Sequence, residues 1–255
     1  MKLAEIELAD PKIILLGQFG TGKTCLASTL GEGCLYLDLD GGLRASATLK
    51  DQFQAMRAKI EVVQILERDP RSPTVLLKVK EQVSKLLDLS VKGTLPWKYI
   101  VIDGYTNLAE SAIRWVQKAN GLIGKPLQIQ HWGMAFMEIE EVLQQLRAIP
   151  IVFVLIAHTH REVSDDEGVK YEILTPGQKL KDKVPGYFDE AWMMKVTGSG
   201  TARRYAVMTQ STGMYNAKTR GQLADNTDAN KGMVEILRSI GWHDKALAPV
   251  ATSVK

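Results

Sequence analysis

The sequence predicts an α/β fold with a mostly parallel central sheet, helices flanking both of its faces, and an antiparallel extension of the sheet near the C-terminus. Over the first 160 residues, apolar strand-like runs such as "KIILLG" alternate with helical patterns. Strands that are apolar along their whole length are typical of parallel sheets covered by helices. Later in the chain, the strand-like runs "DEAWMMKV" and "RRYAVMTQ" are joined only by "TGSGTA", which favours an antiparallel pair.

The order of elements follows from this alternation. The strands expected in the parallel part are the apolar runs at 12–17, 34–40, 60–65, 98–103 and 149–158. The helices expected between them cover 22–31, 44–59, 72–89, 106–119 and 131–148. In the third of these helices, Ser72 is the expected N-cap and Pro73 the first helical residue.

The remaining segments have a different character. Residues 161–178 are polar and rich in turn-forming residues, which predicts a loop. A short helix is expected at 231–241, after the antiparallel pair. We therefore expect a single domain over 1–241 and a flexible C-terminal tail over 242–255.

Composition excludes several broad classes of protein. The 255 residues are 45% hydrophobic, and the net charge of +3 gives no overall attraction to nucleic acid, so a basic surface must be local. The longest apolar run, "IVFVLIA", is too short to span a bilayer, and the N-terminus lacks the apolar segment of a signal peptide. Cys25 and Cys34 match no metal-binding spacing. We expect a cytoplasmic protein with no membrane partner.

The segment "GQFGTGKT" carries the strongest chemical signal. It matches the phosphate-loop (P-loop) pattern G-x-x-x-x-G-K-[ST], follows a predicted strand and opens a predicted helix. Backbone amides of such a loop point at phosphate oxygens, Lys23 reaches the β- and γ-phosphates, and the Thr24 hydroxyl binds Mg²⁺. The expected nucleotide-binding residues are Gly17, Gln18, Phe19, Gly20, Thr21, Gly22, Lys23, Thr24 and Cys25.

An acidic residue ends the strand "YIVID". In a parallel sheet, Asp103 lies at the carboxyl edge beside the P-loop, where a carboxylate can hold Mg²⁺ directly or through water. The alternative is an aspartate that caps the next helix. We favour the magnesium role, together with Thr24, because a P-loop requires such a partner.

A second acidic pair lies in "LDLDGG". Asp38 and Asp40 are two residues apart, so both side chains leave the strand on one face, and Asp40 is nearer the carboxyl end. Asp40 could orient and deprotonate an attacking water. The alternative is a turn aspartate in front of two glycines.

Histidine ends another predicted core strand, in "LIAHTHRE". His158 could contact the γ-phosphate and report its loss to the following loop. A metal site formed with His160 and a plain strand-end histidine remain alternatives.

Two late basic residues lie in "NAKTRG". Lys218 and Arg220 follow the second strand of the antiparallel pair, in a turn closed by glycine. Taken alone, they are most simply two solvated charges on a hairpin.

In this order, the five features resemble the core of RecA-type ATPases. The resemblance covers about residues 11–221, and the combination of "LDLDGG", "AHTHRE" and "AKTRG" is most similar to short phage RecA-like nucleotide-binding proteins linked to single-strand annealing recombination. It implies binding and hydrolysis of ATP with Mg²⁺, with catalytic roles for Lys23, Asp40 and His158. It also implies a homo-oligomer, a ring or short filament, in which Lys218 and Arg220 act in trans on a neighbour's ATP. For a phage protein, the compartment is the host cytoplasm.

The sequence departs from the RecA pattern in three places. RecA-like proteins usually carry glutamate where Asp40 stands, so weak or conditional hydrolysis is expected. Only about ten residues precede the first strand, so filament assembly through a RecA-type N-terminal segment is not expected. The loop expected at 161–178 is mainly acidic, which is unfavourable for contacting a phosphate backbone.

The resemblance makes single-stranded DNA the expected substrate and a single-strand-binding protein a further candidate partner. The candidate DNA contacts are Lys118, Lys125, Lys179, Lys181 and Lys183, although a lysine run is often a solvated helix face. Two other functions remain open. One is a small-molecule or nucleotide kinase, and the other is an ATP-gated interaction module with little turnover.

Overall fold

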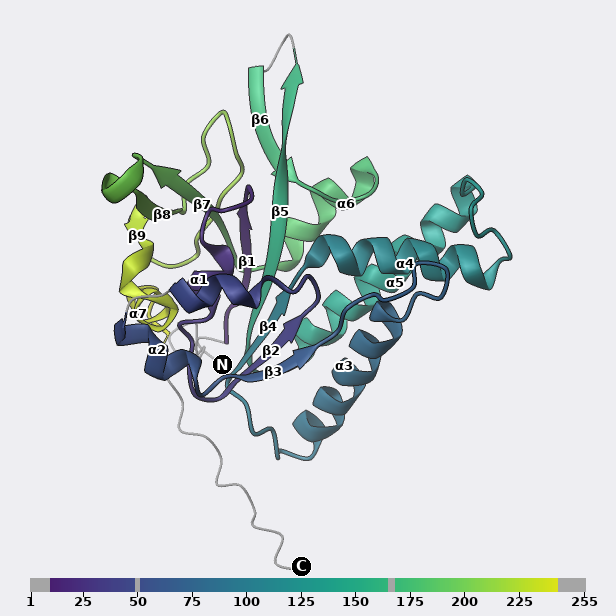
Figure 1. Ribbon diagram of the computed structural model, residues 1–255, viewed down its shortest axis with the longest axis horizontal. Helices are drawn as coiled ribbons and strands as arrows, with labels where there is room; N and C mark the ends of the chain where they lie inside the picture. The colour runs from purple at the N-terminus through teal and green to yellow at the C-terminus, as the bar shows by residue number, and fades with distance from the viewer. Residues whose placement is uncertain (1–9, 49–50, 165–167, 243–255) are drawn as a thin grey trace, which may run out of the picture.

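The computed structural model describes residues 10–48, 51–164 and 168–242 (Figure 1). In this part of the chain, nine strands form one mixed sheet. The strands are β1 (Lys12–Gly17), β2 (Cys34–Asp38), β3 (Glu61–Gln64), β4 (Tyr99–Asp103), β5 (Val152–Ser164), β6 (Gly168–Ile173), β7 (Glu190–Thr197), β8 (Arg204–Met208) and β9 (Thr227–Asp228). The helices are α1 (Lys23–Ala27), α2 (Asp51–Arg57), α3 (Val75–Val91), α4 (Tyr105–Ala119), α5 (Ile129–Ala148), α6 (Gln178–Lys183) and α7 (Met233–Ser239).

The strand order confirms the predicted fold class. The sheet runs β3-β2-β4-β5-β1-β7-β8-β9, with β6 paired to β5. The pairs from β3 to β7 are parallel, and the pairs β7–β8 and β8–β9 are antiparallel. β5 lies between the P-loop strand β1 and the acidic strand β4. The carboxyl ends of these strands meet at one edge of the sheet, where ligands bind in open α/β sheets.

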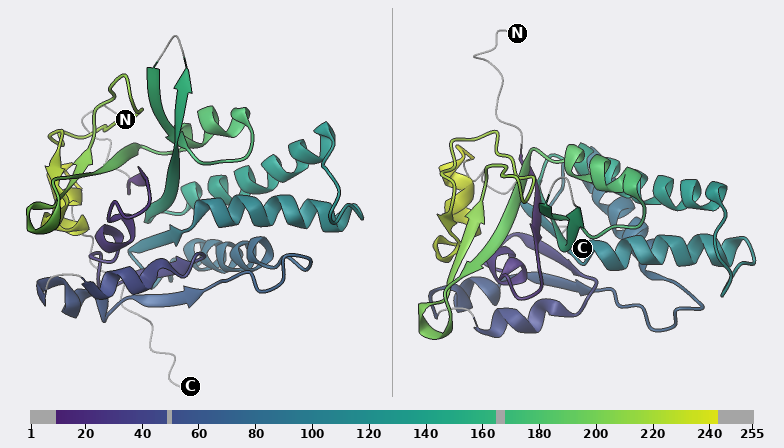
Figure 2. Two further views of the ribbon diagram at one scale, coloured as in Figure 1. Left: turned by 45° about the horizontal axis from the view of Figure 1, so that its top comes forward. Right: turned by 90° about the horizontal axis from the view of Figure 1, so that it is seen from above.

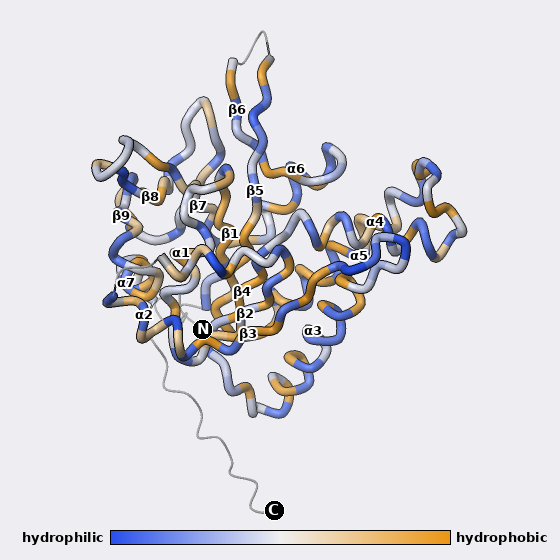
Figure 3. Tube along the Cα trace, viewed as in Figure 1, coloured by the Kyte–Doolittle hydropathy of each residue, from blue (hydrophilic) through white to orange (hydrophobic). Residues whose placement is uncertain are grey.

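Two hydrophobic cores hold the helices on the sheet. Alternate residues of β1 point to opposite faces, so Ile14 and Leu16 join one core while Ile13 and Leu15 join the other. The first core packs α3, α4 and α5 against the sheet, and the second packs α1 and α7 on the opposite face (Figures 1 and 2). The hydropathy view shows the inner strands β2 and β4 in hydrophobic colours and the outer helices as alternating bands (Figure 3). The apolar runs in the sequence therefore correspond to strands buried on both faces.

The predicted start of the third helix is wrong. α3 begins at Val75 with Thr74 as its N-cap, not at Pro73 with Ser72. The reason is tertiary, because a carboxylate oxygen of Glu67 accepts hydrogen bonds from the backbone amides of Thr74 (2.9 Å) and Val75 (3.4 Å). The Ser-Pro signal alone could not reveal this acceptor, which lies seven residues before Thr74.

The loop expected at 161–178 is also largely wrong. β5 continues to Ser164 and pairs with β6 in an antiparallel hairpin that projects from the sheet (Figure 1). Opposite charges face one another in this hairpin, as in the pair Glu162 and Lys170. The polar composition therefore belongs to the outer part of this hairpin, whereas Ile173 at the end of β6 is buried in the first core.

The helices expected at 22–31 and 44–59 differ from their predicted bounds. α1 ends at Ala27, and the hydroxyls of Ser28 and Thr29 then donate to the carbonyls of Thr24 (2.7 Å) and Leu26 (2.6 Å). The helix expected at 44–59 divides into a 3₁₀ segment at Gly42–Thr48 and α2. Hydrogen bonds from hydroxyl side chains to nearby carbonyls, such as those of Ser28 and Thr29, compete with continuation of an α-helix.

The C-terminal part of the described chain is anchored. Trp242, the first residue of the expected tail, is buried, and its indole donates to Asp10 (2.9 Å). Residues 243–255 of that tail lie outside the described residues. No described helix combines the length and the apolar character needed to cross a lipid bilayer.

Thr29 links the P-loop helix to α7. Its hydroxyl is buried and accepts a hydrogen bond from the backbone amide of Met233 (2.6 Å), the first residue of α7. Thr29→Val removes this acceptor with little change of shape, so we predict a loss of about 1–3 kcal/mol in unfolding free energy, measured by urea denaturation. Thr29→Ser, which keeps the hydroxyl, is the control. A valine variant as stable as the wild type would contradict the assigned role.

Candidate nucleotide-binding site

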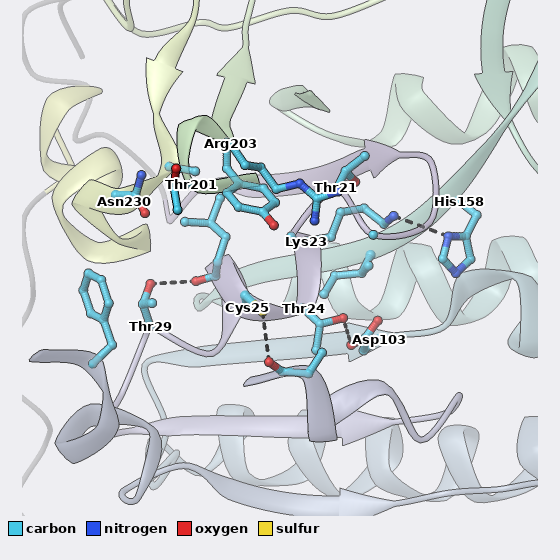
Figure 4. Close-up of a pocket in the computed structure, with 18 residues that line it drawn as sticks. Thr21, Lys23, Thr24, Cys25, Thr29, Asp103, His158, Thr201, Arg203 and Asn230 are labelled. Carbon is cyan, nitrogen blue, oxygen red and sulfur yellow. Dashed lines mark hydrogen bonds between the residues drawn. The ribbon is translucent and has the colours of Figure 1, made fainter. Parts of the chain in front are cut away.

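The P-loop joins the end of β1 to the start of α1 and forms one wall of a cavity of about 690 Å³ (Figure 4). Residues from Gly20 to Leu26 line it. The Lys23 ammonium is buried and donates to the carbonyls of Gly17 (2.7 Å) and Gln18 (2.9 Å). Burial lowers the pKa of Lys23 to about 8, although the charges of Asp103 and Asp40 oppose this shift.

Thr24 and Asp103 are brought together as predicted. The Thr24 hydroxyl donates to Asp103 Oδ2 (2.8 Å), and the buried Tyr36 hydroxyl donates to the same oxygen (2.6 Å). Burial raises the pKa of Asp103 to about 6, and the nearby Asp40 charge adds to the shift, while the two hydrogen bonds oppose it. A hydroxyl and a carboxylate side by side are a hard oxygen donor set that fits Mg²⁺.

Asp38 and Asp40 have different surroundings. Asp38 accepts hydrogen bonds from the Gly41 amide (2.8 Å) and the Gln64 side chain (3.3 Å), so its carboxylate stabilises the turn after β2. Asp40 lies beyond the end of β2, and its Oδ1 accepts from the Gly42 amide (2.8 Å). Its other oxygen, Oδ2, lies 4.0 Å from His158 Nε2. The turn role and a role near the nucleotide are thus both compatible with the geometry of Asp40.

The sequence predicts that His158 ends its strand, and this prediction is wrong. His158 lies within β5, where the strand changes its pairing partner from β1 to β6. It is the last residue of β5 paired with β1, and the next residue is the first paired with β6. Its Nδ1 lies 3.3 Å from the Lys23 ammonium, and its ring packs on Phe19 with centroids 4.2 Å apart. Burial and the Lys23 charge lower the pKa of His158 to about 4, so the imidazole is neutral at pH 7.

The His158–His160 metal alternative finds no support in this arrangement. His160 instead lies close to Glu162 and Glu172, with ligand atoms within 4.8 Å of one another. The Lys181 ammonium already contacts both carboxylates, at 3.0 Å each. A cation held by these groups would have to displace Lys181.

Sequence reasoning missed the wall of the cavity that faces the P-loop. This wall comes from the C-terminal extension and from α2, and its residues are Phe53, Thr201, Arg203, Tyr205, Ala229 and Asn230. Tyr205 packs directly on the P-loop, since a Cβ added to Gly22 would lie 3.0 Å from its ring. The tyrosine is visible in "RRYAVMTQ", but its place depends on how β8 pairs with β7, which no local pattern specifies.

Lys218 and Arg220 lie away from their own P-loop. Lys218 forms backbone hydrogen bonds with Ala191, which is paired with Ile14 of β1. The Arg220 guanidinium contacts the Asp189 carboxylate (2.8 Å), and Asp189 N donates to the carbonyl of Lys12 (2.8 Å), the first residue of β1. At about 3.3 Å per strand residue, Arg220 lies roughly the length of β1 from the P-loop.

The five candidate DNA-contacting lysines divide into two groups. Lys118 and Lys125 lie on α4 and the turn after it, and Lys118 donates to Ser72 Oγ (3.0 Å). The other three are on α6, where Lys181 bonds to Glu162 and Glu172 while Lys183 contacts Glu140. Among the described residues, the ammonium groups of Lys125 and Lys179 have no hydrogen-bonding or ionic partner.

Comparison with known proteins identifies the family. The AAA domain family matches residues 9–221, which is most of the chain. The chain belongs to the AAA domain family. It is therefore a P-loop ATPase of a family that binds ATP with Mg²⁺.

Many solved structures match the chain. One of them, a KaiC-like protein from the hyperthermophilic archaeon Pyrococcus horikoshii OT3, is 14% identical, with 86% of this chain and 88% of that chain covered and a TM-score of 0.42. No curated protein matches the sequence significantly.

Gly104 allows the acidic residues to approach one another. Its φ is +113°, and an added Cβ would lie 3.0 Å from Leu39 Cβ and 3.3 Å from Asp40 N. We predict that Gly104→Ala displaces the Asp40 turn from Asp103 and lowers phosphate release from ATP by about tenfold or more.

Gly93→Ala is the matched control for this prediction. Gly93 also has a positive φ of +66°, at the end of α3, but nothing lies within 4 Å of an added Cβ. Both variants carry backbone strain, and only Gly104→Ala should lose activity. Equal ATPase rates in the two variants would show that the close approach at Gly104 does not matter for catalysis.

Proposed function

We propose that the protein binds and hydrolyses ATP between subunits of a homo-oligomer and uses it to act on single-stranded DNA in phage recombination, annealing or replication. The observation that carries the proposal is the position of the Lys218–Arg220 pair. Arg220 is held at the end of β1 opposite its own P-loop, by Asp189 at its guanidinium and by Glu190 at its backbone amide (2.8 Å). An arginine at this end of β1 is far from its own nucleotide and is suited to reach a neighbour's.

In this proposal, the cluster of side chains at the carboxyl edge of the sheet carries out the hydrolysis of ATP. Lys23 would bind the β- and γ-phosphates, while Thr24 and Asp103 would hold the magnesium ion that shields phosphate charge. Asp40 Oδ2 would accept a proton as a water oxygen attacks the γ-phosphorus and the bond to the ADP oxygen breaks. Neutral His158, between Lys23 and Asp40, would contact the γ-phosphate through a ring nitrogen.

Binding of single-stranded DNA would use local basic surface. Lys125 and Lys179 are the best placed of the candidate lysines, because their ammonium groups are exposed and not already neutralised. Lys181 and Lys183 are less suited, since each is already paired with glutamate. A single-strand-binding protein remains a proposed partner, and the host cytoplasm a proposed location.

One alternative has a specific observation in its favour. Asp40 is short, and its Oδ1 is already bonded to the Gly42 amide, which favours slow turnover. An ATP-gated interaction module would need no faster chemistry. A kinase, by contrast, would need an acceptor pocket next to the γ-phosphate.

Phosphate release with and without single-stranded DNA tests the proposal. We expect DNA to stimulate release by the wild type and Lys23→Ala to abolish it, because no other P-loop side chain carries a positive charge. ADP formation only when a small-molecule acceptor is added would indicate a kinase. Retained ATP binding with negligible turnover under all conditions would indicate the gated module.

A mixture of variants tests whether the site is shared. Arg220→Ala keeps an intact P-loop and Lys23→Ala keeps an intact Arg220, so we predict that each is inactive alone and that mixing restores part of the ATPase activity. A guanidinium supplied in trans stabilises charge on the transferred phosphoryl group and is worth about 10³–10⁵ in rate in other P-loop enzymes. If mixed oligomers form, as judged by mass, and activity does not return, the site is complete within one subunit.

A further inference from the structure

Arg203 is a cation that lines the nucleotide cavity and has no role in the catalytic cluster described above. A short turn between β7 and β8, with a 3₁₀ segment at Gly200–Ala202, carries the chain to this position. Within the described residues, the Arg203 guanidinium has no hydrogen bond and no ion pair. In the close-up, its side chain points across the cavity toward Thr21 and Lys23 of the P-loop (Figure 4).

Tyr205 fixes how far this wall stands from the P-loop. Arg203 and Tyr205 are two residues apart in extended backbone, so their side chains leave on the same side. The Tyr205 ring already touches the P-loop backbone, because a Cβ on Gly22 would lie 3.0 Å from the ring. Arg203 is therefore held beside the loop by a packed neighbour rather than carried on a remote segment.

The charged side chains that line the cavity indicate which group Arg203 can bind. Among the described residues, the positively charged side chains lining the cavity are Lys23 and Arg203, because the third basic residue there, His158, is neutral at pH 7. The Lys23 ammonium already donates to the carbonyls of Gly17 and Gln18, and the charges of Asp103 and Asp40 act on it. A guanidinium offers several N–H donors in a planar fork that matches phosphate oxygens. Arg220, at the other end of β1, cannot supply this charge within the same subunit.

We propose that Arg203 contacts a phosphate oxygen of the nucleotide bound to the P-loop of its own subunit. This inference rests on the proposed binding of ATP in the cavity. It separates two arginines by role, because Arg203 acts on nucleotide affinity within one subunit and Arg220 acts on turnover across the interface. It also makes the β7–β8 turn part of the nucleotide site.

Affinity measurements on Arg203→Ala test the proposal, with Arg204→Ala as the matched control. Arg204 carries the same charge one residue later, is exposed, and does not line the cavity. We expect Arg203→Ala to weaken ATP and ADP binding by about 10- to 100-fold, the range for a hydrogen bond to a charged group. Arg204→Ala should change the affinity less than twofold, and Arg203→Lys should retain part of it.

The outcomes separate this inference from the proposed function. If the wild type binds ATP, and Arg203→Ala and Arg204→Ala bind it with the same affinity as each other, the role of Arg203 is overturned while ATP binding by the protein stands. Equal weakening of adenosine, which has no phosphate, would place the guanidinium at the base or ribose and would also overturn it. A wild type that binds no ATP would overturn both. Unfolding of the two variants without nucleotide should match the wild type, because neither guanidinium has a partner to lose among the described residues.

Discussion

The site depends on the hydrogen bonds that the Asp103 carboxylate accepts. This carboxylate is buried, and it accepts hydrogen bonds from Thr24 on α1 and from Tyr36 on β2. These bonds tie the P-loop helix and two strands to one oxygen atom. A buried carboxylate is costly unless such donors surround it, and its raised pKa reflects that cost. The arrangement is well explained if a cation shares the carboxylate when nucleotide is bound.

Most of the sheet could be predicted because its strands are buried on both faces. Runs such as "KIILLG" and "YIVID" have no polar side that could face solvent, so they indicate parallel strands directly. The same pattern predicts that Thr24 and Asp103 lie at one edge of the sheet. The boundaries of α3 and the β5–β6 hairpin were not predictable in this way. They depend on Glu67 and on pairing between polar strands, both of which are tertiary effects.

The far wall of the cavity was unpredictable for a related reason. Tyr205 and Arg203 come from an antiparallel pair whose register decides which side chains face the P-loop. The sequence indicates that such a pair exists but not where it packs. The structure thus separates two sets of basic residues. Lys23 and Arg203 line the cavity beside the P-loop, whereas Arg220 lies near the opposite end of β1.

The position of β1 in the sheet affects how the chain folds while it is being synthesised. β1 comes first among the described strands, yet its neighbours in the sheet are Val154 on one side and Glu190 on the other, at the level of Ile13. A ribosome adds about 5–20 residues per second, so this apolar strand waits roughly ten seconds or longer before both partners exist. Pairings so distant in sequence also form slowly. The nascent chain therefore exposes an apolar strand for much of the synthesis of this domain, and chaperone binding to that strand during translation would protect it.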